Sequence, residues 1–329
     1  MALLELRGLR VAFRTREGLV QAVNDVTLSL DRGRTMGLVG ESGSGKTVTA
    51  LTILGLTRSE QTEAAGEALF DGVDLLRLSG SELRSLRGRR IAMVFQDPLS
   101  SLHPMHRIGW QIDEAIRAHE GTSKKAARSR TVQLLRSVGI PDPDARVDAY
   151  PHELSGGMRQ RVMIAIALAL SPDLLIADEP TSALDVTVQS QILELLARLQ
   201  SEMGMALLIV SHDLGVIAEQ TDEIVVMYAG RVVEQGTRDD VIGAAIHPYT
   251  RGLLDSIPHV DGPRVAELTP IPGAPPNAVS LPSGCAFHPR CVHALASCAL
   301  KVPDLALVGS DHRVACPVMA PLAVDSSNR

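Results

Sequence analysis

The stretch Gly40-Glu41-Ser42-Gly43-Ser44-Gly45-Lys46-Thr47 decides the fold of this chain, because it fits the pattern G-x-x-x-x-G-K-[ST] of a phosphate-binding P-loop. Its glycines let backbone N–H groups approach phosphate oxygens, and the helix that follows adds the positive end of its dipole. Lys46 can reach the β- and γ-phosphates, and the Thr47 hydroxyl can ligate Mg²⁺. We therefore expect a nucleoside triphosphate to contact Gly40, Ser42, Gly43, Ser44, Gly45, Lys46 and Thr47.

The residues around the loop have the pattern that a P-loop requires. Residues 35–39 form a short apolar run that predicts a buried strand entering the loop, and residues 47–56 have apolar side chains at helical spacing. Residues 3–13 and 19–30 alternate as the strands of a half-buried sheet do. Phe13 lies on the first of these strands, where its ring either stacks on an adenine or packs within the sheet.

The composition is that of a globular chain, and the length of 329 residues predicts two domains, or one large domain with an appendage. The net charge of −6 argues against a bulk nucleic-acid binder. A basic cluster within residues 81–90 indicates the solvated face of a helix.

The longest apolar run, 162–170, is far shorter than the roughly 20 residues of a membrane span. No signal peptide is visible, so we expect the chain to stay in the cytoplasm.

A second potential anion site lies far from the P-loop. Ser155, Gly156 and Gly157 open a helix that is predicted to continue to Leu170, and the free N–H groups at a helix start attract anions. Taken alone, a Ser-Gly-Gly sequence is usually no more than a helix start.

Two carboxylate residues follow the apolar strand that is predicted over residues 173–177. Asp178 and Glu179 follow it directly, and carboxylates there are costly unless they are paired or bound to metal. Asp178 can help to hold Mg²⁺, and Glu179 can polarise a water molecule beside it. Gln96 and His212 each follow a further predicted strand, over 91–95 and 206–210.

Together these residues resemble the ATP-binding subunit of an ABC transporter, over about residues 1–240. Six motifs occur in the order typical of that family. They are the P-loop at 40–47, the Q-loop glutamine Gln96, the LSGGM signature at 154–158, Walker B at 174–178 with Glu179, the D-loop at 182–185 and the switch His212.

The resemblance implies the fold and the roles of these residues. An ATPase domain over 1–235 is expected to have a RecA-like α/β core, an antiparallel β subdomain and a helical subdomain over about 97–170. Two such subunits are expected to enclose ATP head to tail, so that the Ser155-Gly156-Gly157 helix start of one faces the P-loop of the other. Glu179, His212 and Gln96 are then catalytic, and Thr47, Gln96 and Asp178 contact Mg²⁺.

The C-terminal part narrows the resemblance. Residues 247–254 and the Pro-rich stretch 258–284 look like the extension of dipeptide/oligopeptide importer ATPases, over 236–329. This implies two membrane permeases, an extracytoplasmic peptide-binding protein and a peripheral place on the cytoplasmic face of the membrane. Nickel or another small solute is an alternative cargo, and a soluble non-transport ABC ATPase is a more distant one. Glu179 and His212 argue against a subunit that binds ATP without hydrolysing it.

All four cysteines lie in this extension. Intervals of five, six and seventeen residues separate Cys285, Cys291, Cys298 and Cys316. Thiolates suit iron–sulfur clusters or zinc, although structural zinc sites usually begin with cysteines only two to four residues apart. Disulfides are not expected in a reducing cytoplasm. The spacing also looks like the cluster-binding tail of some peptide-importer ATPases, so a [4Fe–4S] cluster is expected, with zinc as the alternative.

Overall fold

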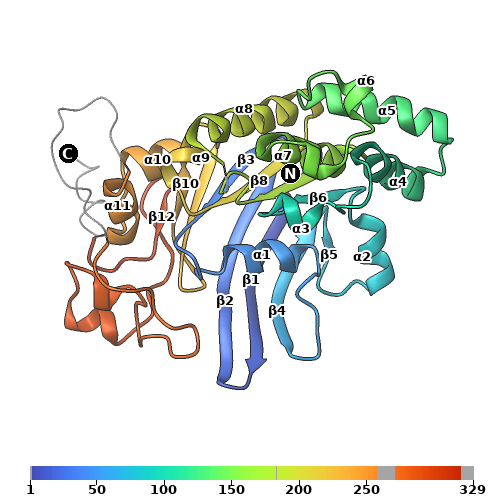
Figure 1. Cartoon of the computed structure of the whole chain (residues 1–329). Helices are drawn as coiled ribbons and strands as arrows, with labels where there is room; N and C mark the ends of the chain where they lie inside the picture. The colour runs from blue at the N-terminus through green and yellow to red at the C-terminus, as the bar shows by residue number, and fades with distance from the viewer. Residues whose placement is uncertain (1, 183, 258–270, 320–329) are drawn as a thin grey trace, which may run out of the picture. The chain divides into compact units, whose positions relative to one another are not determined.

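The computed structural model describes residues 2–182, 184–257 and 271–319 (Figure 1). Contacts within the chain divide it into two compact units. The described residues of the first unit are 31–34, 78–182 and 184–210, and those of the second are 2–30, 35–77, 211–257 and 271–319.

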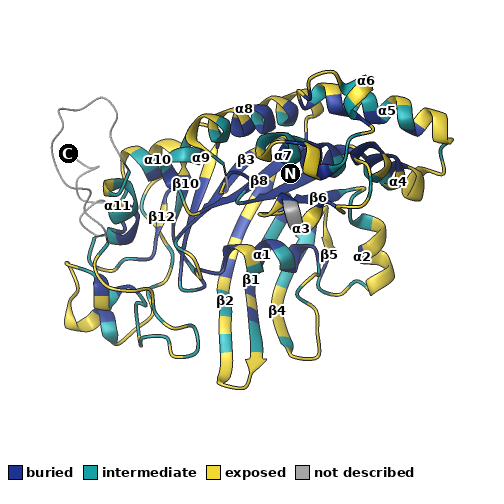
Figure 2. Ribbon diagram, in the orientation of Figure 1, coloured by how far each residue is buried: buried dark blue, intermediate teal, exposed yellow. Residues whose placement is uncertain are grey.

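Three parallel strands form the centre of the first unit. They are β6 (Ile91–Val94), β7 (Leu174–Asp178) and β8 (Ala206–Ser211), in the order β8-β7-β6. The register pairs Ile91 with Leu174 and Leu174 with Ala206. Every residue of these strands is buried, as the dark blue ribbons of Figure 2 show. The continuous apolar runs in the sequence fit this, because a parallel strand is covered on both faces.

Helices make up most of the remainder of the first unit. Ser79 caps α2 by a capping box, in which Glu82 completes the second hydrogen bond. Asp185 caps the longest helix, accepting a hydrogen bond from the Val188 N–H at 3.0 Å. The helices are α2 (Gly80–Leu86), α3 (Pro98–Ser101), α4 (Ile108–Glu120), α5 (Lys124–Ser137), α6 (Pro143–Arg146), η1 (Pro151–Glu153), α7 (Gly156–Leu168) and α8 (Val186–Met203).

The basic helix expected over 81–90 is shorter than predicted. Helix α2 ends at Leu86, and Gly88 follows with a positive φ of 75°. Arg90 does not lie on a solvated helix face, because its Nε donates to Asp173 Oδ2 at 2.6 Å. The sequence interpretation of this cluster was therefore wrong for its last residues.

The second unit contains a four-stranded sheet that matches the expected antiparallel β subdomain. Its order is β2-β1-β4-β5. Strands β1 and β4 are antiparallel, with Leu4 opposite Phe70 and Phe13 opposite Thr62. The strands are β1 (Ala2–Thr15), β2 (Gly18–Asp31), β4 (Thr62–Phe70) and β5 (Val73–Asp74).

A second group of strands in this unit leads into the P-loop. Its order is β11-β12-β10-β9-β3, and β3 and β9 are parallel. Residues Ala229 and Gly230 turn the β9–β10 hairpin with φ values of 49° and 81°. The elements are β3 (Thr35–Val39), β9 (Glu223–Tyr228), β10 (Arg231–Thr237), β11 (Ala306–Leu307), β12 (Arg313–Val314), α1 (Lys46–Ile53), α9 (Leu214–Ala218), α10 (Arg238–Gly243), α11 (Pro248–Asp255), η2 (His288–Arg290) and η3 (Ala296–Ala299).

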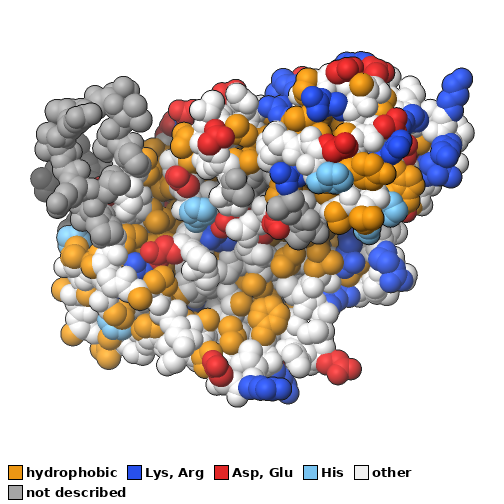
Figure 3. Space-filling model, viewed as in Figure 1, with side chains coloured by type: hydrophobic (Ala, Val, Ile, Leu, Met, Phe, Trp, Pro, Cys, Tyr) orange, Lys and Arg blue, Asp and Glu red, His pale blue; other side chains and the backbone are white. Residues whose placement is uncertain are grey.

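The described part of the extension has a small apolar core. Ile246 and Val314 are buried together, and Val308, Cys316 and Met319 pack against them. Other large apolar side chains stay on the surface, since Val292 is 81% and Leu300 83% exposed. Figure 3 shows hydrophobic side chains at several places on the visible face. Among the described residues, no helix has both the length and the apolarity of a membrane span.

Candidate functional site

The P-loop joins β3 to α1 within the second unit. Gly40, Gly43 and Gly45 have φ values of 154°, 79° and 101°, a region that L side chains rarely adopt. At Gly45 a Cβ atom would lie only 2.3 Å from the Ala22 carbonyl oxygen, so no other residue fits there. The glycines of the motif are therefore needed for the path of the loop.

Lys46 lies at the first position of α1, and its ammonium group returns into the loop. It donates to the carbonyl oxygens of Gly40 at 2.6 Å and Glu41 at 2.9 Å, and lies 3.4 Å from Ser44 Oγ. Lys46 is buried, at 4% exposure, whereas Thr47 is exposed. The positive charge is thus enclosed by the loop that the sequence predicts to bind phosphate.

The first unit brings together two of the expected catalytic residues. Gln96 Nε2 donates to Glu179 Oε2 at 2.8 Å, although 83 residues separate them. Asp178 is 3% exposed as the last residue of β7. Glu179 leaves the strand with a φ of 45°, and its N–H donates to the Val210 carbonyl at 2.9 Å.

The signature residues also lie in the first unit. Ser155 is the N-cap of α7, and its Oγ accepts a hydrogen bond from the Met158 N–H at 3.3 Å. A Cβ atom on Gly157 would lie 2.9 Å from Val188 Cγ1, so this glycine lets α7 approach α8 closely. Ser182 Oγ donates to the Glu179 carbonyl at 3.2 Å. Ala183 of the predicted D-loop lies outside the described residues.

Two further predicted residues lie in the second unit with the P-loop. Phe13 is half-buried on β1. His212 is exposed and follows β8 directly. Neither position distinguishes the functional from the structural interpretation, so both roles stay predictions.

None of the four cysteines of the extension is in a disulfide bond; Cys298 is buried, and the other three are half-buried. Burial raises the pKa of Cys285, and a hydrogen bond from the Phe287 backbone partly opposes that rise. Burial likewise raises the pKa of Cys291, against a hydrogen bond from His293. The Met319 N–H donates to Cys316 Sγ at 3.4 Å.

These contacts give part of the chemistry that a cluster requires. Soft thiol donors are gathered in one unit, and backbone amides point at three of the four sulfur atoms. However, no group of three or more His, Cys, Asp or Glu side chains within 2–182, 184–257 and 271–319 is arranged to hold a metal ion. The described residues therefore contain no preformed site for the expected [4Fe–4S] cluster or for zinc. Residues 258–270 of the Pro-rich stretch and 320–329 of the extension lie outside the described part of the chain.

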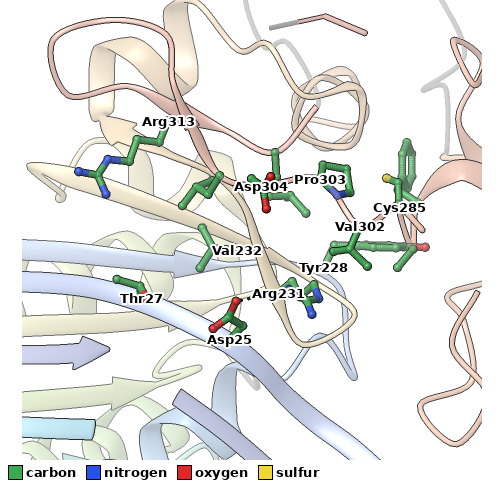
Figure 4. A pocket seen from close by; sticks show the side chains of 15 residues that line it. Asp25, Thr27, Tyr228, Arg231, Val232, Cys285, Val302, Pro303, Asp304 and Arg313 are labelled. Atoms are coloured by element: carbon green, nitrogen blue, oxygen red, sulfur yellow. Dashed lines mark ion pairs between the residues drawn. The ribbon is translucent and has the colours of Figure 1, made fainter. Parts of the chain in front are cut away.

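A cavity of about 430 Å³ lies beside the cysteine segment. Figure 4 shows Tyr228 from β9 and Cys285 from the extension on the same side of it, with Arg231 and Asp25 at another side. Arg231 Nη1 lies 3.9 Å from Asp25 Oδ2. The walls of the cavity come from β2, from the β9–β10 hairpin and from the extension. The extension therefore packs against the strands that flank the P-loop.

Sequence reasoning missed the residues that join this extension to the P-loop. Arg290 forms two hydrogen bonds to the Glu41 carboxylate, at 2.6 and 3.0 Å, and the Tyr249 hydroxyl accepts from the Glu41 N–H at 2.7 Å. One signal was present in the sequence. A carboxylate within a phosphate-binding loop needs a cationic partner, but the pattern alone does not say which arginine provides it.

Comparison with known proteins places the chain in a family. Residues 23–182 match the ABC transporter family, and residues 233–298 match the oligopeptide/dipeptide transporter C-terminal region. A Brucella abortus protein, provisionally named a peptide import ATP-binding protein, is 49% identical over 97% of this chain and 96% of its own length. A Brucella ovis protein of the same name is 50% identical over 95% and 96%.

Solved structures show the same architecture. A dimeric ATP-binding cassette in a post-hydrolysis state, bound to ADP and Pi, has a TM-score of 0.64 and 27% identity, covering 71% of this chain and 98% of its own. CbiO1 from Clostridium perfringens, part of the ABC transporter complex CbiONQ, has a TM-score of 0.63 and 28% identity, covering 74% and 91%. They confirm the predicted RecA-like ABC ATPase fold. The chain therefore belongs to the family of ABC transporter ATP-binding subunits, in the group that carries the oligopeptide/dipeptide transporter C-terminal region.

Proposed function

We propose that this chain is the ATP-binding and ATP-hydrolysing subunit that powers import of dipeptides and oligopeptides through an ABC transporter. The observation that carries the proposal is the joining of an ABC cassette to an oligopeptide/dipeptide transporter C-terminal region in one chain. The names of the Brucella relatives point the same way. The second matched region begins at residue 233, which supports a boundary between an ATPase domain over 1–235 and an extension over 236–329. We place the helical subdomain over about 97–170 within the ATPase domain.

In the proposed mechanism the P-loop binds the triphosphate. The backbone from Gly40 to Thr47 surrounds the phosphates, and the Lys46 ammonium exchanges loop carbonyls for phosphate oxygens. This exchange is favourable because a charge-assisted hydrogen bond to an anion is stronger than one to a neutral carbonyl. Phe13 stacks on the adenine.

Hydrolysis is assigned to groups at the ends of the strands. Asp178, Gln96 and Thr47 would hold Mg²⁺, which would neutralise negative charge on the triphosphate. Glu179 accepts a proton from the attacking water, and the Gln96 amide at 2.8 Å orients its carboxylate. His212 contacts the γ-phosphate.

The proposed assembly is a transporter complex at the cytoplasmic face of the membrane. A second ATPase subunit binds head to tail, so that Ser155, Gly156 and Gly157 face its nucleotide. Two permeases and an extracytoplasmic peptide-binding protein complete the complex. The dimeric cassettes among the structural relatives support the pairing.

We further propose that Cys285, Cys291, Cys298 and Cys316 hold a [4Fe–4S] cluster that stabilises the extension. The amide hydrogen bonds to three of the sulfur atoms support this. Since the thiols do not form a ready ligand set, metal binding would draw them together. Anaerobically purified protein should be brown and carry about four irons per chain. Colourless protein that carries stoichiometric zinc and no iron would show that the site binds zinc instead of the cluster. Protein that carries neither metal would overturn the proposed metal site.

Growth on peptides tests the transport function. A strain that needs one amino acid, with no redundant importer, should lose growth on short peptides containing it when the gene is deleted, and should keep growth on the free amino acid. Restoring the parental gene, but not a Lys46→Ala variant, should restore growth. Normal growth of the deletion strain on peptides would contradict peptide import, and lost nickel uptake instead would identify the alternative cargo.

A further inference from the structure

Glu41 places a carboxylate inside a loop that is built to bind anions. A negative charge beside nucleotide phosphates weakens their binding unless a cation neutralises it. Arg290, 249 positions later in the sequence, supplies that cation through a bidentate pair at 2.6 and 3.0 Å. The Arg290 side chain is 5% exposed and that of Glu41 is 25% exposed, so the pair is largely shielded from solvent.

Arg290 is itself held from several directions. Its Nε donates to the Pro272 carbonyl at 2.8 Å, and its Nη1 lies 3.3 Å from the Tyr228 hydroxyl. Hydrogen bonding to the Glu41 carboxylate raises the pKa of Arg290 above its usual value, so the guanidinium stays charged. Its geometry is therefore fixed by the extension and β9 rather than by Glu41 alone.

Tyr249 of α11 holds the backbone of the same loop residue. Its hydroxyl accepts from the Glu41 N–H at 2.7 Å. The ring is fully buried and packs against Tyr228 and Phe287, with centroids 4.6 and 5.4 Å apart. The extension thus contacts both the side chain and the backbone of Glu41.

The third polar group of Glu41 leads to Lys46. The Glu41 carbonyl accepts from the Lys46 ammonium at 2.9 Å and from the Ser44 N–H at 3.2 Å. The carboxylate, N–H and carbonyl of one loop residue are therefore all engaged. The extension contacts the carboxylate and the N–H, and the carbonyl accepts from Lys46, the lysine assigned to the phosphates.

We propose that the C-terminal extension completes the ATP site, with Arg290 and Tyr249 as positioning residues that hold Glu41, and through it the P-loop and Lys46, ready for nucleotide. The inference rests on the proposed function, because it concerns the same ATP site. It predicts that ATP affinity depends on residues that no ATPase motif contains. The competing explanation is that Arg290 only fastens the extension to the core.

Titration of the full chain with Mg-ATP by calorimetry tests the inference. Arg290→Gln should weaken ATP binding about tenfold or more, because it leaves the Glu41 carboxylate unpaired. Tyr249→Phe keeps the packed ring but removes the acceptor of the Glu41 N–H, and should weaken binding several-fold. Arg313→Gln is the matched control. It removes one charge from an exposed arginine of the same extension, and should change affinity less than twofold.

A double-mutant cycle separates positioning from simple stabilisation. In the Glu41→Gln background, Arg290→Gln should have less than a twofold further effect, because its partner charge is already gone. In assembled complexes, Arg290→Gln should raise the KM for ATP and leave kcat nearly unchanged. Circular dichroism at the assay temperature verifies that each variant is folded.

Two results would overturn the inference, and they are distinguishable. If folded Arg290→Gln protein binds ATP as the parent does while its melting temperature falls, the extension is only fastened by Arg290, and the ATPase function stands. If the parent chain itself fails to bind Mg-ATP, the inference and the proposed function fail together.

Discussion

At the scale of single residues, Glu179 has an unusual conformation. Its φ of 45° lies in the left-handed region, which costs on the order of 1–3 kcal/mol for a residue other than glycine. The hydrogen bonds to Val210 and from Gln96 hold it there. Its carboxylate is consequently fixed where β7 ends, directly after Asp178.

Replacing this carboxylate should separate ATP hydrolysis from ATP binding. Glu179→Gln should lower hydrolysis by about 10² to 10⁴ in the assembled transporter, because a positioned base is lost, while ATP affinity is kept and the ATP-bound dimer accumulates. Lys46→Ala is the contrasting variant, since it should weaken binding itself. Phosphate release and calorimetry measure the two effects. Turnover of Glu179→Gln at the parental rate would exclude Glu179 as the base.

At the scale of elements, the start of α7 combines a helix cap with a proposed nucleotide contact. Ser155→Ala should destabilise the protein by about 1 kcal/mol, because the cap is lost. Ser155→Asp should cap α7 as well as serine does, yet it adds a negative charge that should repel the partner's ATP. Urea unfolding and ATPase assays should therefore show parental stability but lost hydrolysis for the Asp variant. Parental ATPase in that variant would mean that Ser155 is only a cap.

The start of α11 should make stability depend on pH. His247 Nδ1 accepts from the Tyr249 N–H at 3.1 Å, and burial lowers the His247 pKa from 6.5 to about 4, against the nearby Glu234 charge. The unfolded chain therefore binds a proton below about pH 6.5, whereas the folded chain does so only near pH 4. The free energy of unfolding should thus fall by about 2 kcal/mol from pH 7 to pH 5 through this group.

A matched variant isolates this contribution. His247→Asn keeps a side-chain acceptor for the helix start but does not titrate. Both proteins retain Glu234 and its neighbour His312, whose Nε2 lies 2.8 Å from Glu234 Oε1. Urea unfolding at the two pH values should show a dependence about 2 kcal/mol smaller in the variant. Equal dependence in both proteins would show that His247 is not the titrating group.

At the scale of the whole molecule, the proposed transport function requires the chain to pass the energy of hydrolysis to membrane permeases. The segment from Asp97 to Trp110 follows Gln96 and exposes apolar side chains, with Met105 77% and Trp110 46% exposed. Trp110 stacks on His106 with centroids 4.0 Å apart. We propose that this surface receives a permease.

Substitutions on that surface should uncouple transport from hydrolysis. Met105→Ser and Trp110→Ala should abolish peptide uptake by reconstituted transporters while the isolated chain keeps its basal ATPase rate. Leu19→Ser, which alters an exposed apolar residue on β2, 42% exposed, is the control and should transport normally. Full uptake by both surface variants would place the permease contact elsewhere.

Local sequence chemistry determined the P-loop, the strand leading into it, the strand that ends at Asp178 and the helix start at Ser155, since each depends on neighbouring residues. The exact end of α2 was predicted wrongly, because Gly88 stops the helix before Arg90. Only the tertiary structure decided which distant groups meet. Gln96 reaches Glu179 across 83 positions, and Arg290 reaches Glu41 across 249. Such pairs leave no periodic trace in the sequence, because the packing of whole elements, rather than local backbone preference, brings them together.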